Sequence, residues 1–349
     1  MDRYWIGLVM IKADIDSYKP QKVNAHEVSI LEALLKESGF VSGNELAKMI
    51  GLSRTSVHSK IEQLKQSSFK IEASPKKGYR LKEEPKAMNA HLLAIYQKEL
   101  PENFTINYYP CLDSTNEEAE RQFYQKLQPP FAIISSKQTQ GRGRLGRQWQ
   151  SQKNTNLYCS ILFAPNIAPE KLQKFTLWAG LEVCKALQKY ISDSDLKIKW
   201  PNDLYYRERK LSGMLTEAKI DTDRMHTIVF GIGINVNSSA KTMPQSIQSI
   251  ATSLKEITGD TISLNQIAIA VIAAVIRAYS ICMNTEESTK LPIQWQDYDY
   301  LKNKRVELMQ NHKTIKGTVL GINDDGALLL KTDADVIKTI HSGDVTLKK

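Results

Sequence analysis

Glycine and arginine alternate in segment 141–149, which reads Gly-Arg-Gly-Arg-Leu-Gly-Arg-Gln-Trp. Glycine makes a backbone mobile and lets it approach a ligand closely. Arginine carries a planar cation whose fixed fork of N–H groups suits phosphate and carboxylate. The segment therefore predicts a loop that closes over an anionic small molecule, and the alternative interpretation is a basic surface turn.

The glycines of this loop, Gly141, Gly143 and Gly146, also match the Gly-x-Gly-x-x-Gly pattern of dinucleotide sites. That fingerprint requires a helix that begins at the loop and an acidic residue about 20 positions further on. Segment 148–154 has no amphipathic helical pattern, and no acidic residue stands at 166. The Gly-Lys-Ser/Thr of a Walker motif is absent as well. We therefore expect a flexible lid and not a dinucleotide cradle.

A lysine is expected at the end of a strand in segment 196–205, Leu-Lys-Ile-Lys-Trp-Pro-Asn-Asp-Leu-Tyr. Lys199 closes the alternating part, and Pro-Asn-Asp at 201–203 turns the chain sharply. A lysine fixed beside such a turn can hold a point charge at a phosphate or a developing oxyanion. The alternative is a lysine that only extends to solvent at the mouth of a hairpin.

Two further polar segments could line a site. Ser-Thr-Asn at 114–116 precedes a helix expected at 117–127, and capping by Asp113, Ser114 or Thr115 explains it equally well. Gly231 and Gly233 share a strand face with Asn235, which predicts a face held open for a base or ribose. A bulge or close sheet packing is the alternative there.

The elements that must position these residues alternate between strand and helix. Strands are expected at 104–109, 132–135, 157–163, 196–200, 210–217 and 227–230, and helices at 91–100, 117–127, 171–190 and 262–283. The pattern predicts a central mixed α/β domain.

A separate basic domain precedes it. Ser42 and Ser53 are expected N-caps of two short helices joined by a turn at Gly51, which predicts a helix-turn-helix. The runs 69–73 and 79–81, separated by Ser-Pro-Lys-Lys-Gly, predict a hairpin wing. Between residues 48 and 82 stand nine Lys and Arg against two Glu. DNA binding is therefore predicted, and a protein-interaction module with a basic face is the alternative.

Candidate DNA-binding residues share an outward position on the second short helix or in the wing. His58 by itself is equally explained as an exposed helix residue. The candidates are Arg54, Thr55, Ser56, His58 and Lys60 for base edges, and Lys76 and Lys77 for phosphates.

The end of the chain predicts a small all-β module. Short strands are expected at 316–322, 327–331, 336–340 and 344–347, with Asn-Asp-Asp-Gly at 323–326 as a hairpin turn. The size is that of an SH3-like barrel, which is typical of a docking platform.

Composition narrows the class of protein. The chain has 349 residues, 42% of them apolar, and a net charge of +9, which favours anionic partners. Cys111, Cys159, Cys184 and Cys282 are far apart and form no Cys-x-x-Cys pair, so we expect reduced thiols in a cytoplasmic protein and no zinc site. No apolar run approaches 18 residues, so no membrane span is expected.

The motifs occur in the order seen in biotin–protein ligases. These are Ser-Thr-Asn at 114–116, the Gly-Arg loop, Lys-Trp-Pro-Asn-Asp-Leu at 199–204, Lys-Leu-Ser-Gly at 210–213 and Gly-Ile-Gly-Ile-Asn at 231–235. With the winged helix, the chain resembles bifunctional members of that family that also repress the biotin operon, from about residue 23 onward. The loop followed by Lys-Trp-Pro-Asn-Asp is the specific part, because lipoate ligases share the domain fold but lack this loop sequence.

The resemblance implies a role for each matching position. The biotin site would comprise Ser114, Thr115, Asn116, Gln138, Gly141, Arg142, Arg144, Lys199, Gly213 and Gly231. The adenylate or ATP site would comprise Arg142, Arg144, Arg147, Trp149, Asn202 and Asn235. Lys199 and Arg144 would be catalytic. Leu145 departs from the best-known repressor pattern, which has arginine there, and this puts regulation in doubt more than catalysis.

The implied protein is a multidomain α+β enzyme. It would comprise an N-terminal extension (1–22, with Met10 as an alternative start), a winged helix-turn-helix domain (23–84), a biotin/lipoate ligase domain (85–298) and an SH3-like domain (299–349). It would use biotin, ATP and Mg²⁺, with no metal-ligating residues of its own. Its partners would be the biotin carboxyl carrier protein, operator DNA and a second copy in a ligand-dependent dimer. The alternatives are a ligase with a vestigial DNA domain and a biotin-sensing regulator with weak ligase activity.

Overall fold

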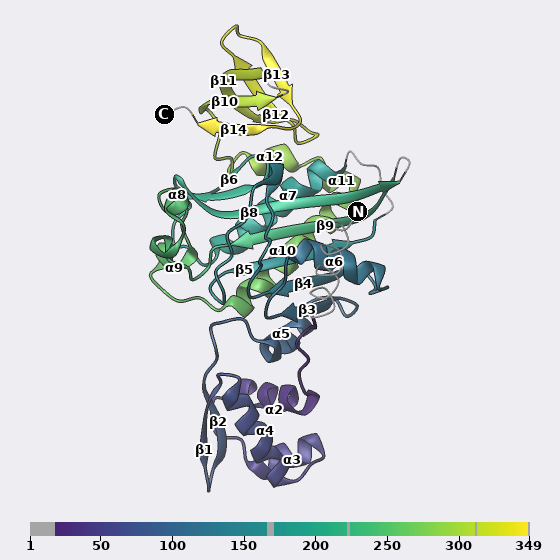
Figure 1. Ribbon diagram of the computed structural model, residues 1–349, viewed down its shortest axis with the longest axis vertical. Coiled ribbons are helices and arrows are strands. Elements are labelled where there is room, and N and C mark those ends of the chain that lie inside the picture. Colours follow the sequence, from purple (N-terminus) through teal and green to yellow (C-terminus); the bar gives the residue numbers. More distant parts are fainter. Residues whose placement is uncertain (1–17, 166–170, 222–223, 311–312, 348–349) are drawn as a thin grey trace, which may run out of the picture.

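The computed structural model describes residues 18–165, 171–221, 224–310 and 313–347. A small helical domain with a hairpin lies at one end, a layered α/β domain in the middle and a small β domain at the other end (Figure 1). The predicted multidomain α+β architecture is therefore confirmed. Most of the expected N-terminal extension, including the alternative start at Met10, lies outside the described residues.

Two helices of the first domain begin at the N-caps that the sequence predicts. Ser42 Oγ accepts a hydrogen bond from the Glu45 N–H at 3.1 Å, and Ser53 Oγ accepts one from the Ser56 N–H at 3.1 Å. Gly51 adopts φ 68°, a left-handed conformation that suits glycine. Three helices result: α2 (Ala25–Lys36), α3 (Gly43–Ile50) and α4 (Arg54–Gln66).

The wing pairs β1 (Lys70–Ser74) with β2 (Gly78–Glu83) in antiparallel register. A bridge between Val41 and Tyr79 ties it to the start of α3. Gly78 has φ 102°, and a Cβ there would collide with the Val41 backbone. The position therefore requires glycine, and the predicted winged helix-turn-helix is confirmed.

The central domain is built on a seven-stranded mixed sheet with the order β3-β4-β5-β9-β8-β7-β6. Only β3 and β4 pair in parallel, and the other pairings are antiparallel. The strands are β3 (Thr105–Tyr109), β4 (Phe131–Ser135), β5 (Leu157–Phe163), β6 (Leu196–Lys199), β7 (Asp203–Tyr206), β8 (Arg209–Asp221) and β9 (Arg224–Ile234).

The two faces of this sheet have different coverings. Helices α7 (Lys171–Gln188) and α10 (Leu264–Met283) pack on one face, and the shorter α6 (Thr115–Tyr124) packs on the other (Figure 1). Successive strand residues point to opposite faces. Cys159 and Ile161 therefore enter the main core, while Ser160 faces α6. The face beside α6 is only partly covered, and it carries the site.

By length and composition alone, helix α10 is long and apolar enough to cross a membrane. No membrane span is expected from the sequence, because polar residues interrupt every apolar run. The helix is a core element here, and 50% of its most apolar 18-residue window is buried inside the fold. It packs lengthwise against α7. Its apolar composition is explained by this burial.

Shorter elements connect and cover these layers. They are α5 (Ala90–Tyr96), η1 (Gln97–Glu99), η2 (Arg144–Gly146), η3 (Ala240–Thr242), α8 (Gln245–Gln248), α9 (Leu254–Thr258), α11 (Thr285–Ser288) and α12 (Leu291–Trp295).

The C-terminal domain is a five-stranded antiparallel sheet with the order β13-β12-β11-β10-β14. The prediction of a small all-β module is therefore confirmed. Its hairpin turn reaches the central domain, where the Trp200 indole N–H donates to the Gly326 carbonyl at 3.0 Å. The strands are β10 (Arg305–Gln310), β11 (Lys313–Ile322), β12 (Leu328–Thr332), β13 (Ile337–Ile340) and β14 (Asp344–Leu347).

The four cysteines, all within the described residues, form no disulfide with one another. Cys159, Cys184 and Cys282 are buried, and burial raises the pKa of the Cys184 thiol to about 12. Thiols of this kind are small core hydrophobes and poor nucleophiles. The expectation of unpaired, reduced cysteines fits this arrangement.

A buried polar cluster joins α2 and α4 of the first domain to α5. The Glu27 carboxylate of α2 contacts His91 Nε2 at 2.9 Å and accepts from Lys60 Nζ at 3.0 Å. His91 lies on α5. The next residue, Leu92, packs in the hydrophobic core of the first domain, and Leu93 packs in the core of the central domain. Burial raises the pKa of Glu27, but hydrogen bonds from His91 and Lys60 outweigh it and leave the pKa below its ordinary value.

Glu27→Gln should lower the free energy of unfolding of the first domain by about 1–3 kcal/mol at pH 7, the usual worth of hydrogen bonds to a charged group. Because the folded pKa is lowered, this stabilisation is present above the ordinary glutamate pKa and is lost as pH falls through the folded value. Thermal unfolding of the variant and wild type between pH 7 and pH 3 measures the difference.

The matched control is Glu62→Gln, which removes an exposed carboxylate from α4 and should change unfolding little. A stability difference for Glu27→Gln that stays constant over this pH range would contradict the role given to the cluster.

Candidate active site

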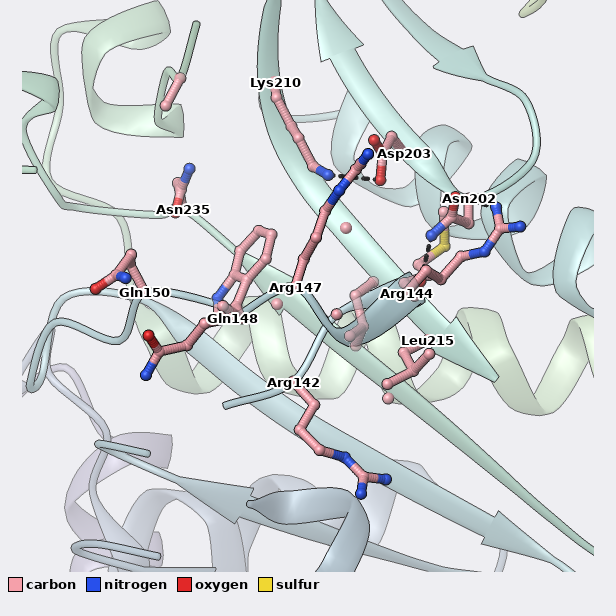
Figure 2. Close-up of a pocket in the computed structure, with 18 of the residues that line it drawn as sticks. Arg142, Arg144, Arg147, Gln148, Gln150, Asn202, Asp203, Lys210, Leu215 and Asn235 are labelled. Atoms are coloured by element: carbon pink, nitrogen blue, oxygen red, sulfur yellow. Dashed lines mark hydrogen bonds and ion pairs between the residues drawn. The ribbon is translucent and has the colours of Figure 1, made fainter. Parts of the chain in front are cut away.

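A cavity of about 480 Å³ opens on the α6 side of the central sheet (Figure 2). This volume lies within the range of small-molecule sites, roughly 300–1,000 Å³. Its walls come from the start of α6, the Gly-Arg loop, the turn after β6, the strands β8 and β9, and the C-terminal strand β14. The fold thus brings together the segments that the sequence singles out.

The floor of the cavity is made by glycines on β8 and β9. Gly213 pairs with Gly233, and Gly231 pairs with Leu215, in regular antiparallel register. A Cβ at Gly233 would lie 2.5 Å from the Trp149 indole, and one at Gly213 would lie 2.9 Å from it. The glycines therefore leave room for a ring on the sheet, and the alternative of a bulge here is excluded.

The polar residues at the start of α6 also face this cavity. Ser114 occupies the N-cap position of α6, but among the described residues its side chain makes no capping hydrogen bond. Gln138 Oε1 accepts from the Thr115 N–H at 2.7 Å and from its hydroxyl at 3.0 Å. The Ser160 hydroxyl contacts Asn116 Oδ1 at 2.6 Å. Capping therefore does not explain the Ser-Thr-Asn sequence.

The Gly-Arg loop folds as a tight turn. The Gly143 N–H donates to the Arg147 carbonyl at 2.7 Å, and the Trp149 N–H donates to the Gly141 carbonyl at 2.9 Å. Leu145 has φ 55°, which is unfavourable for a leucine. A short 3-10 turn is present, and no α-helix begins within the described segment 141–154. The rejection of a dinucleotide cradle is therefore confirmed.

The three arginines leave this loop in different directions (Figure 2). Arg142 pairs with Glu217 at 2.6 Å and Glu117 at 2.5 Å, and although burial lowers its pKa, the carboxylates raise the pKa overall. Arg144 donates to Asn202 Oδ1 at 3.0 Å. Arg147 extends in the direction of Asp203. The loop thus spreads cationic groups along the cavity.

Lys199 ends β6, as expected, and its side chain forms part of the cavity wall. Its Nζ lies 5.2 Å from the centroid of the Tyr205 ring. The next residue, Trp200, is fully buried, and Asn202 Nδ2 donates to the Met214 carbonyl at 2.6 Å. The turn after Lys199 is therefore held from both sides, which fixes the direction in which the lysine leaves the strand.

Nearly all of the predicted ligand-site residues meet at this cavity. Among the described residues, the lining excludes only Gly141, which packs beneath the loop against Gln138 and the Trp149 backbone. The predicted residues on the lining are Ser114, Thr115, Asn116, Gln138, Arg142, Arg144, Arg147, Trp149, Lys199, Asn202, Gly213, Gly231 and Asn235.

Sequence reasoning missed several parts of the wall. Lys210 and Asp203 form an ion pair at 2.7 Å inside two of the quoted motifs, where their spacing alone gives no sign of contact. Asn156 Oδ1 accepts from the Val236 N–H at 3.0 Å and so fixes the loop that carries Asn235. Val345 comes from the C-terminal domain, where no local sequence signal could have indicated the cavity.

The structure places the candidate DNA-binding residues in two settings. Arg54, Thr55 and His58 are exposed on α4, and Lys76 and Lys77 are exposed at the tip of the wing. The Tyr79 hydroxyl lies 3.4 Å from His58 Nδ1, which connects wing and helix. All five residues are therefore accessible to a partner of the first domain.

Two candidates on α4 differ from the expectation of an outward position. Ser56 is half-buried, and its hydroxyl contacts that of Ser53 at 3.0 Å. Lys60 is only 20% exposed in its side chain, because it is bound to Glu27 at 3.0 Å. The expectation that Lys60 lies outside is wrong, since burying Glu27 requires a cation beside it.

No group of three or more His, Cys, Asp or Glu side chains could hold a metal ion within the part of the chain that the structure describes.

Comparison with known proteins agrees with this geometry. Residues 108–235 match the Biotin/lipoate A/B protein ligase family, residues 27–80 match an HTH domain, and residues 303–348 match the Biotin protein ligase C terminal domain. The fold and site thus define a protein ligase that carries a helix-turn-helix domain.

Individual relatives extend over almost the whole chain. The bifunctional ligase/repressor BirA of Bacillus subtilis is 31% identical over 88% of this chain and 94% of its own length. BirA of Escherichia coli is 30% identical over 91% of this chain and 96% of its own length. The biotin protein ligase of Aquifex aeolicus in complex with biotin and ATP has a TM-score of 0.59 at 30% identity, covering 70% of this chain and 99% of its own. The chain belongs to the bifunctional biotin ligase/repressor family.

Gly233→Ala should displace the Trp149 indole from the cavity floor, because the added Cβ would lie 2.5 Å from it. Tryptophan emission should then shift to the red as the ring moves toward water, with Trp149→Phe defining the signal that belongs to this residue. Gly39→Ala is the control, since no atom lies within 4 Å of a Cβ there. Identical spectra for wild type and Gly233→Ala would count against the glycine floor.

Proposed function

We propose that this protein is an ATP-dependent biotin–protein ligase, a biotin–[acetyl-CoA-carboxylase] ligase. It forms biotinyl-5′-adenylate and then transfers biotin to a lysine of the biotin carboxyl carrier protein. The observation that carries the proposal is the cavity that combines Lys199, the loop arginines and the glycine floor in a chain of this family. It offers cationic groups for phosphate, and the Trp149 ring that lies on the glycine floor offers an aromatic surface for a flat ring system.

In the first step, a carboxylate oxygen of biotin attacks the α-phosphorus of ATP. A new oxygen–phosphorus bond forms, the bond to the bridging oxygen breaks, and pyrophosphate leaves. Lys199 binds the carboxylate and stabilises negative charge that develops at phosphorus, and Arg144 acts from the other side of the turn. Positioning and electrostatic stabilisation supply most of the rate enhancement in such chemistry.

Biotin binds beside α6 in this proposal. Ser114, Thr115, Asn116 and Gln138 offer polar groups there, and Gly231 and Gly213 let Asn116 and Trp149 lie close against the sheet. Gly141 contributes indirectly, because a Cβ at this position would press on Gln138 Nε2 at 3.0 Å. Buried hydroxyl and amide groups of this kind give a small ligand its orientation.

The adenylate binds beside Trp149 and Asn235. The buried Trp149 indole N–H has no hydrogen-bond partner among the described residues, which supports a ligand acceptor at this position. Asn202 and Arg147 flank the phosphate. Arg142 is held by Glu117 and Glu217. Its contact with phosphate therefore requires the anion to replace one of these carboxylates.

In the second step, the neutral amine of the acceptor lysine attacks the carbonyl carbon of the mixed anhydride. The bond from that carbon to the phosphate oxygen breaks, AMP leaves, and the nitrogen loses a proton to form an amide.

Mg²⁺ enters the proposal bound to ATP phosphate oxygens, because the described residues offer no carboxylate cluster for it and the ion favours phosphate oxygen and water ligands.

Lys199→Ala should lower the rate of biotin-dependent pyrophosphate release by at least about 100-fold, as loss of one charge-stabilising group commonly does. A coupled pyrophosphate assay with purified protein, biotin and MgATP measures this rate. Transfer of biotin to a carrier domain, detected on its lysine, tests the complete reaction.

The matched control is Lys197→Ala, two residues earlier on the same strand, where the side chain donates to the Asp297 carbonyl. It should keep most of the activity. Near-normal pyrophosphate release by Lys199→Ala would contradict the role assigned to Lys199.

The same protein also acts as a biotin-operon repressor in this proposal, working in the cytoplasm as a dimer that the adenylate favours. Arg54, Thr55 and His58 would read base edges and Lys76 and Lys77 would bind phosphates. The exposure of each of these side chains on α4 or in the wing supports this assignment. In this proposal, Leu145, which is 74% exposed in the loop over the cavity, responds to whether the adenylate is bound.

Replacing both Lys76 and Lys77 with alanine should weaken binding to operator and unrelated duplex DNA alike. The slope of log affinity against log salt should fall by about 1–2, since each lysine that binds a phosphate releases counterions. Binding is measured over a salt series with and without biotinyl-adenylate. Lys36→Ala removes an equally exposed charge from α2 and should leave the slope unchanged. An unchanged slope in the double variant would exclude these lysines as phosphate contacts.

A further inference from the structure

The segment that leads into the C-terminal domain is bound to the outer edge of β6, the last strand of the central sheet. The Ile198 N–H donates to the Tyr298 carbonyl at 2.7 Å, and the Tyr300 N–H donates to the Ile198 carbonyl at 2.9 Å. These hydrogen bonds lie directly before Lys199. The segment 298–300 thus extends the sheet by one short parallel bridge beside the catalytic lysine.

Side chains continue this connection. The rings of Tyr205 and Tyr300 stack with their centroids 5.0 Å apart and an interplanar angle of 29°. Lys199 Nζ lies over the Tyr205 ring, and Lys304 Nζ lies 3.5 Å from the centroid of the Tyr300 ring. Tyr205 is on the cavity wall, whereas Tyr300 is not on that wall within the described chain and is 7% exposed.

We propose that Tyr300 is a positioning residue for the adenylation step, acting through Tyr205 to hold the Lys199 ammonium at the reacting phosphate. The proposal rests on the ligase function proposed above. It gives one side chain of the inter-domain segment, that of Tyr300, an influence on the reaction, although Tyr300 itself does not touch the substrate.

The physical reason is the freedom of a lysine side chain. Its four-carbon stem has many rotamers, and holding one of them costs entropy. The negative face of an aromatic ring attracts an ammonium group and favours the rotamer that lies over it. Stacking on Tyr300 fixes the plane of the Tyr205 ring, so that the position of Lys199 becomes sensitive to a residue outside the cavity.

Tyr300→Leu should lower kcat/KM for biotin in pyrophosphate release by about 5- to 10-fold while KM for ATP changes less than about two-fold, because the ring acts through Lys199, which contacts the biotin carboxylate before and during the reaction. Tyr300→Phe keeps the ring and should restore wild-type kcat/KM. Tyr298→Leu is the control in the same segment and should stay near wild type. Wild-type kcat/KM in Tyr300→Leu, or failure of Tyr300→Phe to restore it, would overturn the proposal.

A double-variant comparison separates positioning from a general structural effect. In a Lys199→Ala background, Tyr300→Leu should cause no further loss of the residual rate, since the two changes act through one group. An equal additional loss in that background would show that Tyr300 acts independently of Lys199 and would refute the proposal.

Acylation of Lys199 by an amine-reactive reagent, followed by mass spectrometry of its peptide, gives a readout that does not depend on the reaction catalysed. Tyr300→Leu should increase the labelling rate several-fold, and Tyr300→Phe should not. Equal labelling of Lys199 in wild type and Tyr300→Leu would reject the positioning role. If wild type releases no pyrophosphate, the proposed ligase function fails while this labelling comparison still decides the proposal for Tyr300.

Discussion

The packing of one indole on two glycines governs the shape of the candidate site. Trp149 lies against Gly213 and Gly233, and a methyl group at either glycine would overlap its ring. This contact brings the Gly-Arg loop down onto the central strands of the sheet. The arginines of the loop, which precede Trp149 in the sequence, are thereby placed along the cavity. A loop that bound the sheet elsewhere would leave the same charges in solvent.

Two other parts of the fold complete the cavity from outside the sheet. On one side, Ser160 of β5 contacts Asn116 and holds the start of α6 against the floor. On the other side, the C-terminal domain is anchored by the Trp200–Gly326 hydrogen bond and contributes Val345 to the lining. The cavity therefore depends on contacts between residues that are 44 and 126 positions apart in the chain. The first domain is joined to this body through α5 and the cluster of Glu27, Lys60 and His91.

Much of the fold follows from local rules that act within a few residues. The caps at Ser42 and Ser53, the left-handed turn at Gly51 and the strand that ends at Lys199 were all predictable, since each depends on neighbouring backbone groups. The candidate site was predictable because its residues stand in motifs of recognisable type and order. Lys60 was misplaced because the helix pattern shows only which face is polar. It does not show that Glu27 would be buried and require a cation.

The sequence by itself determined the three domains, the type of each and the residues that could carry the chemistry, because these depend on periodicity, capping and motif spacing. The tertiary structure alone decided which groups meet. It selected the cavity role of Ser-Thr-Asn over capping, since Gln138 approaches from the loop after β4 and Ser160 from β5. It also placed Tyr300 against Tyr205 beside Lys199. Contacts of this kind depend on how strands are ordered in a sheet and how domains dock, and no local pattern encodes either.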